Sequence, residues 1–315
     1  MNKRALGIVS TLAGASLWGF SGTCSQFLLD NYAVSSFFLT MVRMLGAGVL
    51  FLVVILARHR DKASEILRLP YARRRIVLFG VCGLFLCQIT YIIAVGYTNA
   101  GTTTVLQSLN IVLIMLVTCV LVRRAPRAPE LAGLVLALVA TFLIATQGDF
   151  GQLNIPPMGL FWGLATAVAA AAYSMLGAPL YPKWGSFTVV GMAMIAGGVA
   201  ATCVWGLAFA FPGMDAVASG GNPYGSALIP TLDAWGWFVL AAVTIVGTFA
   251  AFFLFLNGIA VVGAVQGSQL GAIEPVSATV CSAVLTGTVF SAFDLIGLVL
   301  MIGTILLVAA GADEG

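Results

Sequence analysis

Charged residues are scarce in this sequence of 315 residues, because Asp, Glu, Lys and Arg together make up only 8%. A soluble domain carries about 25%, so there are too few charges to cover a surface that faces water. Hydrophobic residues make up 61%, and the mean hydropathy is +1.07. These values exclude a soluble globular protein and predict an integral membrane protein. The net charge of +3 is also too small to indicate a nucleic-acid partner.

Residues that build metal or catalytic centres are few. The one histidine, His59, stands between Arg58 and Arg60 in a basic stretch. The six cysteines are dispersed through apolar segments without a Cys-x-x-Cys pair, and we expect them to pack as small hydrophobes. The sequence has no Gly-x-Ser-x-Gly elbow and no P-loop. We therefore expect no enzyme activity, no catalytic residue, no metal site and no cofactor.

Long apolar runs dominate the sequence. A helix that spans a bilayer needs about 20 predominantly apolar residues. Ten segments have this character: 5–29, 34–57, 75–97, 101–122, 130–147, 157–180, 186–211, 234–257, 262–289 and 292–311. We predict an all-α integral membrane protein of ten transmembrane helices. The first segment is expected to be retained, because its apolar body is longer than that of a signal peptide.

The basic residues are distributed asymmetrically about these segments. Thirteen of the fourteen Lys and Arg residues lie at the N-terminus or in even-numbered loops, and seven of them lie between 58 and 75. The opposite loops hold only acids, such as Asp30, Asp149 and Asp233. Cytoplasmic loops carry the excess of basic residues. The pattern predicts cytoplasmic N- and C-termini in a multi-pass protein of the bacterial inner membrane.

The sequence contains an internal repeat. ELAGLVLALVATFLIATQG at 130–148 aligns without gaps with DLIGLVLMIGTILLVAAGA at 294–312, at an offset of 164 residues. Because each copy holds five segments, an odd number, the second copy must be upside down in the membrane. Such inverted repeats are typical of secondary transporters, with a substrate site near the midplane between the halves. We divide the chain into two five-helix repeats, 1–150 and 154–315.

Two ionisable residues are expected deep in the membrane. At 1.5 Å per residue, Glu274 lies ~18 Å and Arg43 ~14 Å along its segment. A charge at such a depth costs ~3 kcal/mol on insertion scales, so it needs a partner, a proton or water. For Glu274 three explanations are open: the carboxylate contacts a ligand, it is protonated, or it anchors the fold. Arg43 pairs with a substrate carboxylate, with Glu274 or with backbone carbonyls, and we favour a structural or gating role. Pro275 leaves the carbonyl of Gly271 without its donor and is expected to kink the helix.

Other polar and aromatic residues follow helical spacings. Asn110 corresponds to Glu274 in the repeat, and Gln107 shares its helix face. Such faces turn toward partners or a cavity, and aromatic rings beside small residues would form an apolar slot. Each of these residues also has an explanation that needs no cavity: Trp and Tyr anchor at membrane interfaces, and Gln or Asn bonds a neighbouring helix. The candidate substrate-binding residues are Trp18, Gln88, Tyr91, Gln107, Asn110, Trp162, Tyr173, Asn257 and Glu274, with Arg43 and Pro275 as gating or structural residues.

Three features carry a resemblance to a known family. Arg43 lies inside the second segment, AVGYTNAG (94–101) ends the third, and IEPVSATV (273–280) lies within the ninth. Together with ten segments in two halves, they resemble the drug/metabolite transporter superfamily and its EamA-type exporters, most of all the YddG-like aromatic amino-acid exporter branch. The sequence departs from the family at Ile111, where a proline is frequent, and at Arg123-Arg124 and TGTVFS, where Gly-Glu is frequent.

The resemblance implies export of amino acids, aromatic and other apolar ones, and of related small metabolites, by alternating access around a central midplane cavity. Export of cationic drugs or nucleosides is the alternative. A channel is disfavoured by the inverted halves, and a membrane-embedded enzyme by the lack of a catalytic set. The expected partners are a small-molecule substrate and the lipid bilayer, with no nucleic acid, and the chain is expected to be a monomer or a homodimer.

Overall fold

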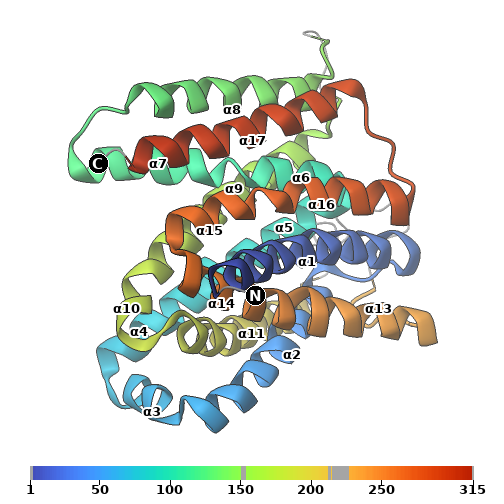
Figure 1. The fold of residues 1–315 in the computed structure, drawn as a ribbon. Helices are drawn as coiled ribbons and strands as arrows, with labels where there is room; N and C mark the ends of the chain where they lie inside the picture. The colour runs from blue at the N-terminus through green and yellow to red at the C-terminus, as the bar shows by residue number, and fades with distance from the viewer. Residues whose placement is uncertain (1–2, 150–153, 212–213, 215–226, 314–315) are drawn as a thin grey trace.

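The computed structural model describes residues 3–149, 154–211, 214 and 227–313, and these form a bundle of helices (Figure 1). Eight helical segments of the described part are long and apolar enough, by length and composition, to cross a membrane. They are Lys3–Tyr32, Ser36–Arg58, Pro70–Tyr97, Ala100–Val122, Ala128–Thr146, Pro157–Trp184, Ser186–Ala210 and Ala234–Val262. An interrupted ninth segment and the helix Ala292–Asp313 follow. The described residues form no β-strand beyond one isolated bridge, and the predicted ten-helix, all-α fold is confirmed.

Several of the ten segments consist of more than one helix. The uninterrupted ones are α1 (Lys3–Tyr32), α2 (Ser36–Arg58), α8 (Ala128–Thr146), α11 (Ser186–Ala210) and α17 (Ala292–Asp313). The composite ones are α4, η1 and α5 (Pro70–Leu78, Phe79–Phe85, Leu86–Tyr97), α6 and α7 (Ala100–Gln107, Asn110–Val122), α9, η2 and α10 (Pro157–Gly177, Ala178–Leu180, Tyr181–Trp184), α13, η4 and α14 (Ala234–Thr244, Ile245–Ala250, Ala251–Val262), and α15, α16 and η5 (Ala264–Gly271, Ile273–Cys281, Ser282–Thr286). A short helix, α3 (Arg60–Arg68), lies between α2 and α4.

The helix boundaries of the first copy recur in the second. α13, α15 and α17 each begin 164 residues after α4, α6 and α8. Segments three and eight both contain a wide π-helical turn, η1 and η4, and segments four and nine are both interrupted near their middle. The repeat therefore extends beyond the aligned stretch at 130–148, to the local conformation of the backbone.

The acid that opens each aligned stretch has a capping role. Glu130 accepts a hydrogen bond from the backbone N–H of Arg127 (2.7 Å), three residues before it, and also binds Arg124 (2.5 Å). Asp294 accepts the equivalent bond from the backbone N–H of Ser291 (2.8 Å). The first N–H groups of a helix lack intrahelical partners, and a carboxylate is favoured there by the helix dipole. The repeated acid thus marks the start of α8 and of α17.

Helices of each copy pack against helices of the other copy in a symmetric way. α1 packs against α14 and α16 of the second copy, and α9 packs against α5 and α6 of the first. The remaining helices pair with their counterparts: α2 lies on α11, and α8 lies on α17 (Figure 1). Such an interlocked arrangement places the first helix of each copy at the centre, between the halves.

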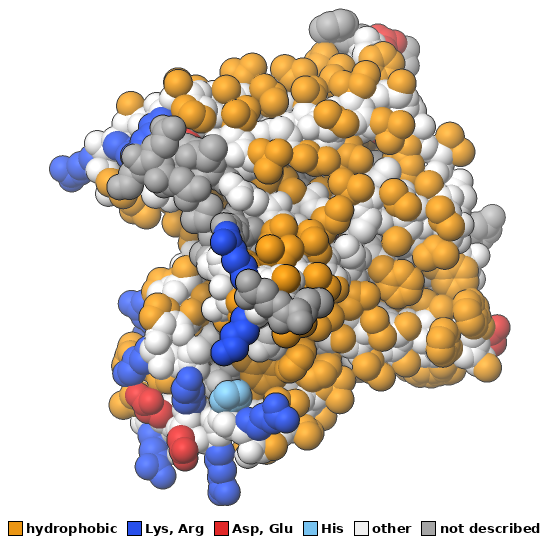
Figure 2. All heavy atoms as spheres, viewed as in Figure 1, with side chains coloured by type: hydrophobic (Ala, Val, Ile, Leu, Met, Phe, Trp, Pro, Cys, Tyr) orange, Lys and Arg blue, Asp and Glu red, His pale blue; other side chains and the backbone are white. Residues whose placement is uncertain are grey.

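The bundle has a basic end and an acidic end. The basic end carries the N-terminus of α1, all of α3, and the corner between α7 and α8, and Figure 2 shows its Lys and Arg side chains gathered at the left. The acidic end carries Asp30 and Asp233. The backbone N–H of Gly236 and the Tyr32 hydroxyl both donate to Asp233, and they hold the pKa of its carboxyl below the usual value.

Glycines on facing helices bring α1 and α14 into close contact. A Cβ on Gly258 of α14 would lie 2.6 Å from the backbone nitrogen of Thr11 and 2.8 Å from the carbonyl oxygen of Gly7. A Cβ on Gly14 of α1 would lie 2.6 Å from the backbone nitrogen of Phe255. Because backbone atoms cannot move aside as side chains do, this contact requires glycine, as is common where membrane helices pack closely.

We predict that Gly258→Ala lowers the stability of the detergent-purified protein by about 1–3 kcal/mol, the usual cost of overpacking. The matched control is Gly271→Ala, also a helical glycine, where a Cβ would meet only the Phe255 ring at 3.7 Å. The control should be neutral or slightly stabilising, since alanine favours helix. Thermal unfolding of both variants measures the difference, and equal midpoints would contradict close α1–α14 packing.

Candidate substrate site

The middle of the bundle is marked by two helix interruptions. Segment four breaks at Ser108–Leu109 and segment nine at Ala272, so Asn110 and Glu274 each stand just after a break. α6 and α16, the halves of these segments toward the acidic end, pack against each other. Their other halves share only α17 as a neighbour: α7 also lies on α8 and α9, and α15 also lies on α1 and α14. The two broken segments therefore cross near Asn110 and Glu274 and diverge toward the basic end.

The basic end is hollowed where these segments diverge. Figure 2 shows an indentation between the part of the surface that carries α7 and α8 and the part that carries α3, α4 and α10. α15 lies between these two parts in the same view (Figure 1).

Glu274 lies at the crossing without a partner. Its side chain is half-buried, and its carboxylate makes no hydrogen bond or ion pair with another described residue. It is within electrostatic range of Cys87, Tyr91 and Tyr173, none of which carries a compensating charge. A carboxylate at this depth is costly, so it requires a proton, water or a positively charged ligand.

The backbone around Glu274 is tightly held. Gly19 of α1 lies against it, and a Cβ there would be 2.5 Å from the backbone nitrogen of Ala278 and 2.8 Å from the Glu274 carbonyl oxygen. Pro275 is buried and occupies the first turn of α16, where its missing N–H is tolerated. The break at Ala272 coincides with the carbonyl of Gly271, which Pro275 leaves without a donor. The rigid setting fixes where the carboxylate stands.

Arg43 is buried, with 5% of its surface exposed, and is bound by three hydroxyls. Its Nε donates to Thr248 Oγ1 (3.3 Å), Nη1 to Ser25 Oγ (3.3 Å) and Nη2 to Ser21 Oγ (3.1 Å). The Ser25 and Thr248 hydroxyls donate their own protons to Ser21 and Val243 carbonyls, so their oxygens are free to accept from the guanidinium. Of the alternatives that the sequence left open, neither Glu274 nor a backbone carbonyl is its partner among the described residues.

Three further candidates join helices around the crossing. Gln107 Nε2 donates to Thr166 Oγ1 of α9 (3.1 Å) and lies 3.5 Å from Cys87 Sγ of α5. The hydroxyls of Tyr91 and Thr104 are 2.9 Å apart. Tyr173 stacks on Phe79, with ring centroids 5.5 Å apart. These contacts link segments three, four and six.

The remaining candidates differ in their surroundings. Trp18 packs against Phe252 and Phe255, with ring centroids 4.8 and 4.5 Å away. Trp162 contacts Phe161 in an edge-on arrangement, and the buried Nε1 atoms of Trp18 and Trp162 have no hydrogen-bond partner among the described residues. Gln88 and Asn110 are half-buried. Asn257 is exposed and donates to the Phe253 carbonyl of its own helix (2.7 Å), so the structure does not bring it into the cluster.

Sequence reasoning missed the residues that complete these contacts. Ser21 and Thr248 were not singled out, although both bind Arg43. Gln26 was also missed: it is 6% exposed and bonds three other segments of the chain. The available signal was a set of hydroxyl and amide side chains within apolar helices, since such groups need partners inside a membrane.

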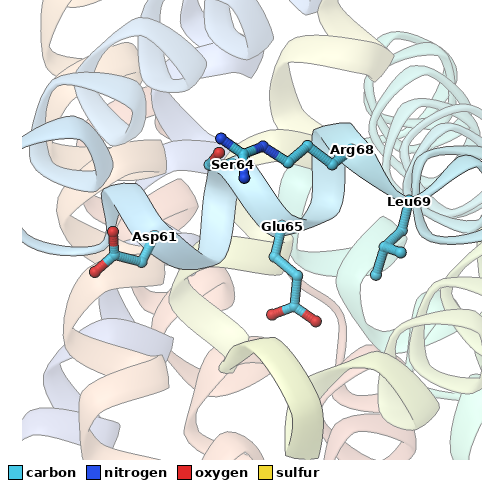
Figure 3. Close-up of a pocket in the computed structure, with 5 residues that line it drawn as sticks. All are labelled: Asp61, Ser64, Glu65, Arg68 and Leu69. Carbon is cyan, nitrogen blue, oxygen red and sulfur yellow. The ribbon is translucent and has the colours of Figure 1, made fainter.

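One further hollow lies away from the crossing. It has a volume of about 370 Å³ and is lined by Asp61, Ser64, Glu65, Arg68 and Leu69. Figure 3 shows that these side chains project from α3 and the residue after it, at the basic end. This hollow is a feature of the surface helix and contains none of the candidate residues.

The sequence matches the EamA-like transporter family over residues 5–146 and again over 157–310. The chain belongs to this family. It is 32% identical over 312 residues, 98% of this chain and 97% of the relative, to the uncharacterized inner membrane transporter YicL of Salmonella typhimurium. The predicted membership of the EamA family is thereby confirmed, and the protein is a multi-pass membrane transporter by family.

Two more distant comparisons agree with this assignment. An uncharacterized transporter of Archaeoglobus fulgidus is 22% identical over 187 residues, which is 58% of this chain and 62% of the relative. A protein crystal structure aligns at a TM-score of 0.63 and 19% identity, covering 97% of this chain and 98% of the other. At that identity the likeness shows a shared fold alone.

We predict that Arg43→Lys destabilises the transporter by about 2–3 kcal/mol. Lysine carries one compact ammonium group in place of the planar fork, so the two hydroxyls of α1 and the one of η4 cannot all keep a donor, and each lost buried bond costs about 1–3 kcal/mol. The control is Arg75→Lys, an exposed arginine at the basic end. Thermal unfolding in detergent compares them, and an Arg43→Lys midpoint equal to that of the control would refute the hydroxyl clamp.

Proposed function

We propose that this EamA-family protein exports amino acids, aromatic and other apolar ones, and related small metabolites by alternating access. The observation that carries the proposal is the unpaired carboxylate of Glu274 at the crossing of segments four and nine. The α-ammonium group of an amino acid would neutralise this charge. The YddG-like branch of the family is the sub-branch proposed for this chain.

The surroundings of Glu274 fit a substrate with an apolar side chain. Tyr91 and Tyr173 lie within its electrostatic range, and the half-buried Tyr173 has an aromatic ring with a polar tip, while Tyr91 is buried with its hydroxyl bound to Thr104. Such a mixture of apolar walls and few polar groups is the usual composition of a small-molecule site. Trp18, Gln88, Gln107, Asn110 and Trp162 are proposed as further lining residues, and Arg43 and Pro275 as structural or gating residues.

One observation favours a second class of substrate. Arg43 is enclosed by three hydroxyls, so it is not presented to a substrate carboxylate. An organic cation without a carboxylate would satisfy Glu274 equally well. Export of cationic solutes is therefore the alternative. It differs from the first proposal because these solutes lack the carboxylate that an amino acid carries.

We propose that the basic end faces the cytoplasm of a bacterial cell and that both termini lie there. Thirteen of the fourteen basic residues support this orientation by the positive-inside rule. In this orientation the hollow of Figure 2 opens to the cytoplasm, where an exporter loads its substrate.

Counterflow into proteoliposomes tests the substrate class. Vesicles preloaded with unlabelled amino acid should accumulate the labelled form transiently and saturably, with phenylalanine and leucine competing better than aspartate. A parallel panel of organic cations covers the alternative. Counterflow of cations without counterflow of amino acids would replace the first proposal by the second, and non-saturating, current-carrying flux would indicate a channel.

We predict that Glu274→Gln reduces counterflow at least tenfold while leaving the protein folded, because glutamine keeps the shape and removes the charge. If protons compete with substrate at this carboxylate, transport by the native protein depends on pH and the variant's residual transport does not. Asp61→Asn, on the surface helix α3, is the matched control and should transport normally. Unchanged counterflow by Glu274→Gln would exclude the carboxylate from substrate binding.

A further inference from the structure

The acidic end of the bundle is closed by a polar junction around Gln26. This side chain, near the acidic end of α1, is 6% exposed. Its Oε1 accepts from the backbone N–H of Ala100 (3.0 Å), and Ser282 Oγ is 3.4 Å from the same oxygen. Its Nε2 donates to Thr288 Oγ1 (3.2 Å). One amide therefore connects α1, the start of α6, η5 and the loop before α17.

The same junction is closed by direct packing of α6 on α16. A Cβ on Gly101, next to Ala100, would lie 2.7 Å from the Phe290 ring and 3.1 Å from Thr279 Oγ1. Thr279 is 7% exposed and stands on α16 between Glu274 and the acidic end. A solute at Glu274 is thus separated from the acidic end by the α6–α16 contact, which Gln26 holds together.

The equivalent helix start in the second copy has fewer contacts among the described residues. α6 begins after Asn99, whose side chain caps the helix by accepting from the Thr102 N–H (2.8 Å). The corresponding helix α15 begins after Gly263, which provides no side-chain cap, and a Cβ added there would meet nothing within 4 Å. This position lies at the basic end, where Figure 2 shows the surface hollowed. Among the described side chains, the two ends of the crossing therefore differ: a polar junction holds the start of α6, and no such junction is found at Gly263.

We propose that Gln26 is the latch of a gate at the acidic end, and that its three hydrogen bonds must break before Glu274 becomes accessible from that side. A net hydrogen bond contributes modestly to stability, so three together can hold the closed state and still be broken within a transport cycle. Two states that differ in which side reaches a midplane site are the requirement of alternating access. The inference rests on that part of the proposed function and not on the identity of the substrate.

Cysteine accessibility tests the latch without any substrate. The reporter is Thr279→Cys in a variant whose six natural cysteines are replaced, probed with a membrane-impermeant maleimide applied at the acidic-end face of oriented vesicles. Gln26→Leu removes all three bonds at similar volume, and we expect the reporter to be labelled about tenfold faster. Thr288→Val removes one bond and should give a smaller increase.

The matched control is Thr11→Val on the same helix. Thr11 is fully buried, and among the described residues its hydroxyl bonds the Gly7 carbonyl of α1 alone, so labelling should stay at the unmodified rate. Equal labelling of the Gln26→Leu, Thr11→Val and unmodified proteins would overturn the latch. Because the readout needs no substrate, a response to Gln26→Leu without amino-acid counterflow would refute only the proposed substrate.

A cross-link provides an independent test if Gln26→Leu fails to fold. Gly101→Cys with Thr279→Cys places two thiols on facing sides of the α6–α16 contact, where a Cβ at 101 would lie 3.1 Å from Thr279 Oγ1. Oxidation should hold the gate shut and abolish counterflow of whichever solute the native protein carries, and reduction should restore it. Normal counterflow by the oxidised protein would show that this contact does not open during transport.

Discussion

A polar group inside a lipid-embedded bundle must find its partner within the bundle, because the surrounding hydrocarbon offers none. Arg43 satisfies this constraint with three hydroxyls from α1 and η4. Thr248 belongs to the wide turn η4 and Ser21 and Ser25 to α1, so the guanidinium ties the second copy to the first. Glu274 has no such partner among the described residues. This contrast identifies Arg43 as a structural charge and Glu274 as a candidate binding charge.

The wide turns and the interruptions have a common consequence for the fold. A π-helical turn displaces the face of a helix, and such turns are frequent at functional sites. Here two of them, η1 and η4, occupy equivalent places in the two copies, and a third, η5, ends segment nine. The breaks of segments four and nine likewise occur twice, and only where the segments cross. The two breaks are thus found in the region between the halves, where irregular backbone can be buried in protein and away from lipid.

The architecture could be predicted from the sequence because hydropathy identifies the segments that lie in lipid, and loop charge identifies the side of the membrane on which each loop lies. The third segment, expected at 75–97, is Pro70–Tyr97, and the ninth, expected at 262–289, is 264–286. Of the two helix breaks, in segments nine and four, only the first could be predicted from the sequence. Pro275 signals the break at Ala272, but the first copy breaks at Ser108–Leu109 with Ile111 in the corresponding place. Tertiary contacts must hold that break, and a single sequence does not contain them in readable form.

The site was predicted less well than the fold for a related reason. Glu274, Gln107 and Tyr91 stand out because they are polar in apolar runs, and the structure brings them to one region. Asn257 stood out equally and faces away. Which face of a membrane helix is buried depends on its neighbours, since lipid is as apolar as the protein core. Spacing along one helix therefore identifies a polar stripe without saying whether it meets a cavity, another helix or the headgroups.

The copies have kept one backbone plan while their polar chemistry has diverged. Asn110 and Glu274 occupy equivalent places after the two breaks, yet only one of them is a carboxylate. Asn99 and Gly263 precede equivalent helices, yet only Asn99 caps its helix. A strictly symmetric transporter would close both ends with equal bonds and favour neither state. In the proposed alternating-access cycle, divergence at these few positions would give the two halves different energies, so the preference for one open side would depend on side chains and the ability to switch on the shared backbone.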